Sequence, residues 1–450
     1  MELIKYVILG ISILMYVLVI AFQKKKVWIT TGAAVLVILL GMIFPGFVFN
    51  TPEDSVLAAF AGGHFYALIH SLFSVINWNV IMIYLGSMTI AALFLYSNVP
   101  ARIADSIINS SKNTGLAIVL ILAMTGIISI FVENVATVLV MAPIALALCK
   151  KLKMDPTYFM IGLAVMSNLE GTATLVGDPP SMIFAAYAGY NFNDFFVHSG
   201  KLSVFFIIQA GLLVGCIYFY CFFAKVGKEK IEVEKTPVIS WVPFIVLILM
   251  IAGLAGISFV KTDFAYLSGL YVLILGIICL LWYRFNQKKT GAELGELIKG
   301  LDWETIFFLL GIFVVVGSIQ ETGLLEDFAL FLAKICGGSK LLGFIIILVV
   351  SVIISGFVDN VPYIIAMLPI AGSMALAMNI DKELLMFALL VGSCLGGNLT
   401  PFGASANVVS MGIVHKEGYP MDFKVWLKIA GPFTLLTTGT AALVLWLLWA

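Results

Sequence analysis

The chain has 450 residues, of which 62% are hydrophobic and 11% are charged, and its formal net charge is zero. Soluble globular domains carry about a quarter charged residues, so the composition excludes that class. The charge balance provides no basic surface for nucleic acid. We find no P-loop, catalytic histidine cluster or nucleophile motif, which argues against an enzyme. The composition therefore predicts an all-α polytopic protein of the cell (plasma) membrane.

Apolar segments long enough to cross a hydrocarbon core of ~30 Å recur along the chain. The first lacks a basic start and a cleavage site, so we expect it to be a retained span and not a signal peptide. Together with two interrupted helices described below, these segments predict about ten transmembrane helices. The uninterrupted ones are residues 4–22, 29–49, 81–95, 202–223, 242–260, 267–283, 306–319 and 432–449.

The basic residues predict a topology. If Lys24–Lys26 are cytoplasmic, the positive-inside rule leaves both termini outside. This assignment holds only if two long apolar segments, 115–152 and 341–378, each enter and leave the membrane on the same side. We therefore expect two re-entrant hairpins; the alternative is two full spans in each segment. Six lysines then remain outside: Lys5, Lys201, Lys261, Lys334, Lys340 and Lys382.

An internal repeat supports this arrangement. Residues 131–181 align with 357–407 without a gap, and roughly a third of the positions are identical. Each half then holds five crossings and one hairpin, and an odd number of crossings inverts the second half. We expect a first inverted repeat at 1–223, a cytoplasmic linker at 224–239 and a second repeat at 240–450. Polar matches include Glu133 with Asp359, Asn134 with Asn360, Ser167 with Ser393, Gly171 with Gly397, and Thr174 with Thr400.

Each hairpin is followed by a helix that small and helix-breaking residues interrupt. These broken helices are expected at 156–190, with SNLEGTATLVGDPPS, and at 383–415, with SCLGGNLTPFGASAN. Irregular backbone at membrane depth is tolerated where it lines a cavity. Broken helices at matching places in two halves predict a transporter binding site.

Four acids lie in these segments, and the two hairpin cores and broken stretches contain no Lys or Arg. An intramembrane charge costs about 3 kcal/mol or more, so we expect these acids to bind protons or cations. Asp178 and Glu170 have the alternative of capping a helix or pairing with backbone donors. Hydroxyl, amide and carbonyl oxygens nearby suit Na⁺. The expected ion and substrate ligands are Glu133, Asn134, Thr137, Ser167, Asn168, Glu170, Gly171, Thr172, Thr174, Asp178, Asp359, Asn360, Ser393, Gly397, Asn398, Thr400, Ser405 and Asn407.

Two Na⁺ sites are expected within this set, one at Asn134, Ser167 and Gly171 and one at Asn360, Ser393 and Gly397. The six cysteines and four histidines form no ligand motif, so we expect no structural metal and no disulfide framework. No cofactor is expected beyond Na⁺ or H⁺ as the coupling ion.

The strings FVENVATVLVMAP, SNLEGTATLVGDPPS, FVDNVPYIIAMLP and GGNLTPFGASANVV resemble the signatures of P-protein-like permeases. This group lies in the ion transporter superfamily with arsenite permeases and NhaD-type antiporters, and is related to divalent anion:sodium symporters and citrate transporters. The resemblance implies a homodimer with a fixed scaffold and an elevator-type moving transport part that holds the hairpins and broken helices.

The expected function is secondary active transport of a small inorganic ion coupled to H⁺ or Na⁺, as Na⁺/H⁺ exchange or export of arsenite or another anion. In the related sodium/dicarboxylate symporters each hairpin tip carries Ser-Asn-Thr, whereas Glu133 and Asp359 stand here in place of the Ser. The added negative charge disfavours a dianion. Na⁺-coupled symport of an organic anion such as citrate or a dicarboxylate, and an anion channel, remain alternatives.

Overall fold

The computed structural model describes residues 2–22, 25–49, 63–224, 226, 232–262 and 264–450, and these are mostly helical. Lys24 and residues 225 and 227–231 of the expected linker lie outside the described residues. In the described part, ten helices are long and apolar enough to cross a membrane. The predicted multi-pass, all-α class is therefore confirmed.

The first half of the chain runs from α1 to α11. One short antiparallel pair, β1 (Val197–His198) with β2 (Lys201–Leu202), precedes α11. The helices are α1 (Glu2–Ala21), α2 (Lys26–Ile43), η2 (Gly63–Phe65), α4 (Tyr66–His70), η3 (Ser71–Val75), α5 (Trp78–Tyr96), α6 (Val99–Ser110), α7 (Thr114–Ser129), α8 (Asn134–Leu152), α9 (Thr157–Gly171), α10 (Pro179–Ala188), η4 (Asn193–Phe195) and α11 (Val204–Phe223).

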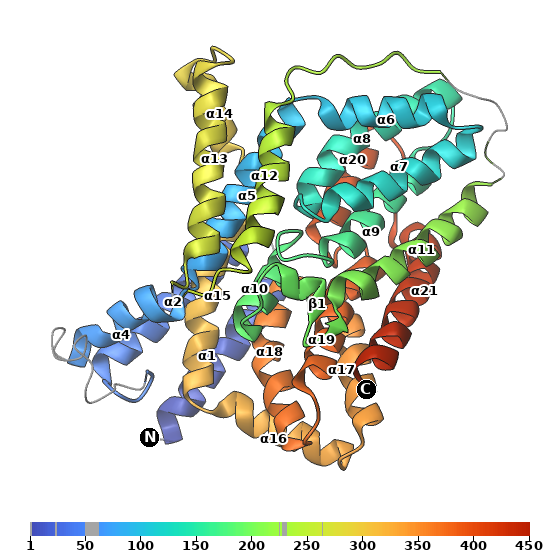
Figure 1. Ribbon diagram of the computed structural model, residues 1–450. Coiled ribbons are helices and arrows are strands. Elements are labelled where there is room, and N and C mark those ends of the chain that lie inside the picture. Colours follow the sequence, from blue (N-terminus) through green and yellow to red (C-terminus); the bar gives the residue numbers. More distant parts are fainter. Residues whose placement is uncertain (1, 23–24, 50–62, 225, 227–231, 263) are drawn as a thin grey trace.

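The second half repeats much of this order. Both termini lie toward one end of the molecule, and α6 and α14 lie at the other (Figure 1). The helices are α12 (Val242–Ile257), α13 (Leu267–Phe285), α14 (Gly291–Lys299), α15 (Trp303–Glu321), α16 (Leu324–Cys336), α17 (Lys340–Ser355), α18 (Asn360–Ala377), α19 (Lys382–Gly396), η5 (Gly397–Leu399), α20 (Ser405–Lys416) and α21 (Phe423–Trp449).

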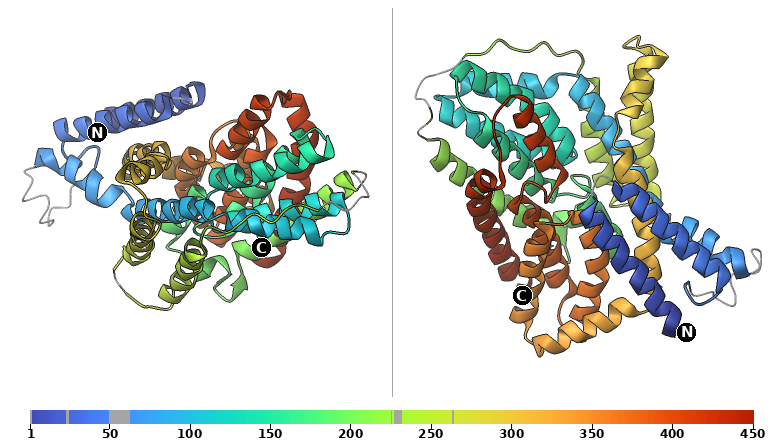
Figure 2. Two further views of the ribbon diagram at one scale, coloured as in Figure 1. Left: turned by 90° about the horizontal axis from the view of Figure 1, so that it is seen from above. Right: turned by 180° about the vertical axis from the view of Figure 1, so that it is seen from behind.

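The helices form two groups. The first, which we name the frame, comprises α1, α2, α5, α12, α13 and α15, in which α13 packs on α5 and α2 packs on α15. The second, the hairpin group, comprises α7 to α11 and α17 to α21, in which α7 packs on α9, α17 on α19 and α11 on α21. The frame stands to one side of the hairpin group in all three views (Figures 1 and 2). Contacts between the two groups include those of α5 with α8 and α10, and of α15 with α18.

Glycines let the frame helices approach closely. A Cβ atom on Gly86 of α5 would lie 2.5 Å from the Val272 carbonyl oxygen of α13. In the other frame pair, a Cβ on Gly311 of α15 would lie 2.8 Å from the Thr30 carbonyl carbon of α2. Small residues at such crossings allow van der Waals contact between backbones, which is a main source of helix association in lipid.

The segments expected to form hairpins each contain two helices joined by a short turn. Residues 130–133 join α7 to α8, and residues 356–359 join α17 to α18. The two pairs come from opposite ends of the molecule, and their tips line one central cavity (Figure 1). Helices α8 and α18 are themselves among the ten of span length. Helix length alone therefore does not separate a re-entrant hairpin from two full spans.

The expected broken helices are interrupted where the sequence predicts. Helix α9 ends at Gly171 and α10 begins at Pro179, while α19 ends at Gly396 and α20 begins at Ser405. The Thr174 hydroxyl donates to the Ile130 carbonyl at 2.5 Å. At the matching positions of the second repeat, the Thr400 hydroxyl donates to the Gly356 carbonyl. In each repeat, the segment that interrupts the broken helix is therefore hydrogen-bonded to the turn of the preceding hairpin.

We expect Gly86→Ala to destabilise the protein by about 1–3 kcal/mol, because the new methyl group meets the α13 backbone, which cannot move aside as a side chain would. Gly256→Ala in α12 is the control, since a Cβ there meets nothing within 4 Å. Thermal unfolding in detergent should show a lower Tm for Gly86→Ala alone. Equal Tm values for the two variants would contradict the described packing of α5 on α13.

Candidate functional site

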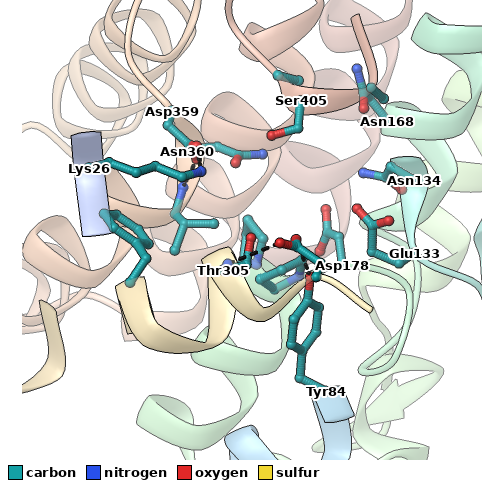
Figure 3. A pocket seen from close by; sticks show the side chains of 17 residues that line it. Lys26, Tyr84, Glu133, Asn134, Asn168, Asp178, Thr305, Asp359, Asn360 and Ser405 are labelled. Carbon is teal, nitrogen blue, oxygen red and sulfur yellow. Dashed lines mark hydrogen bonds and ion pairs between the residues drawn. The ribbon is translucent and has the colours of Figure 1, made fainter. Parts of the chain in front are cut away.

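A central cavity lies where the frame meets the hairpin group. Its volume is about 40 Å³, enough for a small ion with a few waters. Both hairpin tips and both helix breaks contribute to its wall (Figure 3). The frame contributes Lys26, Tyr84, Asp302, Thr305 and Phe308, and the hairpin group contributes Glu133, Asn134, Asn168, Asp178, Pro179, Pro180, Asp359, Asn360, Val361, Ala404, Ser405 and Ala406.

Several helices begin at this cavity. The first residues of α2, α8, α10, α18 and α20 line it, and so does the residue before α15. Each helix N-terminus presents free amide groups and carries roughly half a positive charge. The cavity wall therefore combines a positive backbone field with the acidic side chains that cap these helices.

Acids cap four of these helices, α8, α10, α15 and α18, each with one carboxylate oxygen. Glu133 accepts from the Ala136 amide at 3.0 Å, and Asp178 accepts from the Ser181 amide at 3.0 Å. Asp359 accepts from the Val361 amide at 3.1 Å. In the frame, Asp302 accepts from the Thr305 amide at 3.0 Å. The capping role considered for Asp178 is confirmed, and one oxygen of each carboxylate is left for other partners.

The second oxygens of these acids have different surroundings. Asp302 Oδ2 accepts from the Tyr84 hydroxyl at 3.0 Å, and Asp359 Oδ2 lies 3.5 Å from Lys26 Nζ. Asp178 Oδ2 is buried without a hydrogen-bond partner within the described part of the chain. Glu133 and Asp178 point into the same part of the cavity (Figure 3). Asp178 therefore presents an unsatisfied acceptor that a proton or cation would satisfy.

Lys26 brings a basic group to the acids from outside the hairpin cores and broken stretches, which contain no Lys or Arg. The sequence places it in a charged loop after the first span, but its side chain is only 14% exposed and pairs with Asp359. The Lys26 ammonium also lies 5.3 Å from the centre of the Phe308 ring. Asp359 is therefore not an unpaired intramembrane acid, because the frame supplies its counter-charge.

Three asparagines join the two repeats behind the cavity. The Asn168 amide donates to the side-chain oxygens of Asn398 and Asn407, both at 2.8 Å. Asn407 in turn donates to the Gly397 and Thr400 carbonyls, each at 2.9 Å. Asn168 Oδ1 is buried and has no hydrogen-bond partner among the residues that are described. Since Asn168 also lines the cavity, this oxygen is available to a ligand.

The first expected Na⁺ triple lies together. Ser167 donates to the Asn134 carbonyl at 3.3 Å, and Ser129 donates to Asn134 Oδ1 at 2.8 Å. A Cβ on Gly171 would lie 2.1 Å from Asn134 Oδ1, so only glycine fits beside this side chain. The sequence analysis did not name Ser129, which precedes the hairpin tip by a few residues.

The second expected triple is less compact. Asn360 lines the cavity, but within the described part of the chain Ser393 hydrogen-bonds with Ser355 and Leu390, and Gly397 with Asn407. None of these bonds reaches Asn360. The two repeats therefore differ at the places where the sequence predicts equivalent sites.

The expected site residues divide into two sets. Seven line the cavity: Glu133, Asn134, Asn168, Asp178, Asp359, Asn360 and Ser405. The others are buried but do not line the cavity: Thr137, Ser167, Glu170, Gly171, Thr172, Thr174, Ser393, Gly397, Asn398, Thr400 and Asn407. Glu170 is fully buried beside α11, where Gln209 donates to its Oε2 at 2.6 Å.

The sequence analysis missed the frame side of the cavity. Lys26, Tyr84, Asp302, Thr305 and Phe308 lie outside the repeated segment, so the alignment of the two halves could not select them. One sequence signal was present at Asp302, since an acid just before a long apolar run indicates a helix N-cap. Its place at the cavity depends on how the two helix groups pack.

Comparisons with known proteins agree with the resemblance drawn from the motifs. A family model described as citrate transporter (CitMHS) matches residues 16–392 and 289–450. An uncharacterized transporter of Mycobacterium tuberculosis is 31% identical over 376 residues, which cover 83% of this chain and 86% of that protein. The P protein of Sus scrofa is 23% identical over 447 residues, covering 80% of this chain and 52% of that protein.

Two solved structures share the fold. The YdaH transporter of Alcanivorax borkumensis superposes with a TM-score of 0.61 at 13% identity, covering 92% of this chain and 97% of that one. MtrF of Neisseria gonorrhoeae, assigned to a class of antimetabolite efflux pumps, gives a TM-score of 0.56 at 12% identity, covering 92% and 94%. At these identities the likeness establishes the helical architecture alone.

The two carboxylate oxygens of Asp178 have different roles, so we expect two substitutions of this residue to change the stability of the protein in opposite directions. Asp178→Ala should destabilise the protein by about 0.5–2 kcal/mol because α10 loses its cap. Asp178→Asn keeps an acceptor for the Ser181 amide and removes the buried charge, so its Tm should equal or exceed that of the wild type. Thermal unfolding in detergent at neutral pH compares the three proteins. An Asn variant as unstable as the Ala variant would contradict the assigned roles.

Proposed function

The chain belongs to the citrate transporter (CitMHS) family of membrane transporters, and we propose that it is a secondary active transporter of a small inorganic ion, coupled to H⁺ or Na⁺. The observation that carries this proposal is the cavity between frame and hairpin group, which four acids and one lysine line. The proposed activity is Na⁺/H⁺ exchange or the coupled export of a small anion such as arsenite. Neither a catalytic residue nor a resident cofactor is part of this proposal.

The charges of the cavity favour a cation as one of the bound species. Glu133, Asp178, Asp302 and Asp359 face a single ammonium, Lys26, among the described residues that line it. The helix N-termini offset part of this negative charge. Asp178 Oδ2 and Asn168 Oδ1 are oriented as free acceptors, and oxygen ligands of this type suit Na⁺ or a proton. The small cavity volume supports an ion with few waters.

The arrangement of the helices supports alternating access by an elevator movement. In this proposal the frame is the fixed scaffold, and the hairpin group carries the ion across it. The hairpins are re-entrant, and their turns and the helix breaks lie at membrane depth, where irregular backbone is tolerated beside a cavity. The cavity lies on the surface along which the two groups would slide.

The assembly and orientation complete the proposal. We place the protein in the cell membrane as a homodimer with both termini outside. The side of α6 and α14 is then cytoplasmic, which agrees with Lys150 and Lys151 in the last turn of α8, a helix that contacts α6, and with Lys289 between α13 and α14. The first repeat, the linker and the second repeat keep the expected boundaries at 1–223, 224–239 and 240–450.

Symport of an organic anion such as citrate or a dicarboxylate is the second candidate. The family description names citrate, and Lys26 together with the helix N-termini would attract carboxylates. A citrate trianion would also meet four acids, so protons or cations would have to bind with it. This requirement makes ion coupling common to both candidates.

Internal pH in proteoliposomes that contain a pH dye tests the proposal. Separate outside pulses of Na⁺, Li⁺, arsenite and citrate are given to vesicles with and without the protein. A pH change on the cation pulse, or on the arsenite pulse alone, supports the leading proposal. Silence to cations and arsenite, with a response to citrate, favours the second candidate. Non-saturating currents far above carrier turnover would exclude a transporter and indicate a channel.

Neutralising both hairpin acids should abolish coupling. We expect Glu133→Gln with Asp359→Asn to reduce coupled flux by at least about tenfold, because charged hydrogen-bond groups are worth about 1.5–3 kcal/mol each. The control replaces two exposed acids, Glu296→Gln with Asp327→Asn, and changes the formal charge equally. Size-exclusion chromatography checks dimer assembly in both proteins. Wild-type flux in the hairpin double variant would refute the assignment.

A further inference from the structure

An ion pair joins the frame to the hairpin group at the centre of the molecule. Lys26 is the first residue of α2, and its Nζ reaches Oδ2 of Asp359, the residue that caps α18, at 3.5 Å. Lys26 extends from one side of the cavity toward Asp359 and Asn360, whereas Glu133 and Asn134 lie on the opposite side (Figure 3). The pair therefore connects the two bodies that an elevator movement would separate.

The position of Lys26 is electrostatically unusual for a helix. A cation at a helix N-terminus faces the positive end of the backbone dipole, which is the unfavourable end. The N-terminus of α18 lies close by as well, because Asp359 caps it. Lys26 is stabilised there by acids on two elements and by the face of the Phe308 ring, 5.3 Å away. The acids that act on it are Asp359, Glu304 and Asp302.

The same pair borders a second cavity. Lys26, Asp359, Ala404 and Ser405 line both the central cavity and a neighbouring one of about 340 Å³ between α1 and the second hairpin. The walls of this second cavity are otherwise mostly apolar, with Val19, Ile20, Val358, Phe402, Val408 and Val409, and Glu304 adds one acid. The Lys26–Asp359 pair thus stands at the boundary between the ion site and the space beside it.

The two hairpins are not equivalent in charge. Asp359 has an ammonium as its counter-ion, while Glu133, at the matching place of the first repeat, has no ion-pair partner among the described residues. A cation that binds at Glu133 and Asp178 meets free carboxylate oxygens. A cation that binds at Asp359 must first replace Lys26.

We propose that Lys26 is a built-in counter-cation that competes with the coupling cation for Asp359. In the conformation described here the ammonium occupies the place of that cation and ties the hairpin to the frame. When Na⁺ or a proton binds Asp359, the attraction for Lys26 is lost and the hairpin group is free to move. Lys26 thereby sets the apparent affinity for the coupling cation. This inference rests on the proposed function, because it concerns the same site.

Other titratable side chains near the Lys26–Asp359 pair contribute to any pH dependence of transport. Apart from Asp359, the titratable acids and tyrosine that line the two cavities come from α5, from the start of α15, from the first hairpin turn and from the first helix break. They are Tyr84, Asp302, Glu304, Glu133 and Asp178. These groups are present in the wild type and in every variant at position 26. A change in the cation concentration for half-maximal flux that appears only when Lys26 is replaced is therefore caused by the loss of the lysine.

The test compares Lys26→Met with Lys25→Met in the dye-loaded proteoliposomes. Lys25 is the neighbouring, exposed lysine, so the control removes the same charge outside the site. We expect the cation concentration for half-maximal flux to fall at least about fivefold in Lys26→Met, at the lower end of the usual range of site coupling. It should stay at the wild-type value in Lys25→Met. A Lys26→Met value equal to that of the wild type would overturn the competition.

The outcomes for the two proposals are distinguishable. If the wild type responds to a cation and Lys26→Met responds identically, the proposed function stands and the role of Lys26 fails. If neither protein responds to Na⁺, Li⁺, a pH step or arsenite, the proposed function fails and the competition fails with it. A response in Lys26→Met alone would support the competition, because the internal competitor has been removed.

A second measurement applies if Lys26→Met does not fold. Lys26→Gln removes the charge but keeps a polar side chain, and Lys26→Arg keeps a cation beside Asp359. We expect the cation concentration for half-maximal flux to fall at least about fivefold in Lys26→Gln and to stay close to the wild-type value in Lys26→Arg. A Lys26→Gln value equal to that of the wild type would overturn the proposal.

Discussion

The backbone within the two helix breaks has no access to regular helical hydrogen bonds, and an unsatisfied amide or carbonyl in a lipid-like environment costs several kcal/mol. Side chains of these segments supply some of the missing partners, both in the breaks and in the hairpin turns. Thr174 and Thr400 donate to the hairpin turns, and Asn407 donates to two carbonyls of its own break. The hairpin turns and the breaks therefore stabilise each other, and the place of the cavity follows from this mutual requirement.

A second consequence of ending helices inside the molecule is electrostatic. Free amides at the N-termini of α8, α10, α15 and α18 need acceptors, and an acid caps each of them. The same carboxylates then project their second oxygen toward the cavity or a neighbour. In this fold one carboxylate both caps a helix and offers its second oxygen to a partner or a bound ion. The ion site and the stability of the helix ends are therefore linked.

The sequence alone predicted most of the long apolar helices and both breaks, because Gly and Pro within apolar segments and a gapless repeat are local signals. The expected span 242–260 corresponds to a shorter helix, α12, and α8 and α18 have span length although they were expected to be hairpin halves. The sequence also identified Glu133, Asp178 and Asp359, since acids in apolar segments are conspicuous. It did not predict that Lys26 pairs with Asp359, because two residues far apart in the chain meet only through the packing of α2 and α18. For the same reason Tyr84 and Asp302 were missed. Ala404 stands at the position that Asp178 holds in the first repeat, so the two repeats contribute different charges to the cavity.

The proposed alternating access requires that the cavity between the two helix groups opens to one side of the membrane at a time. Ser405, which lines that cavity, is the position to probe, as a single cysteine in a background without native cysteines and in proteoliposomes of one orientation. The measurement is its rate of reaction with a charged thiol reagent added to either side, with the ion gradient in each direction. Carrier operation predicts that the reactive side reverses with the gradient. Reaction from both sides at once, or from one side under every condition, would contradict it.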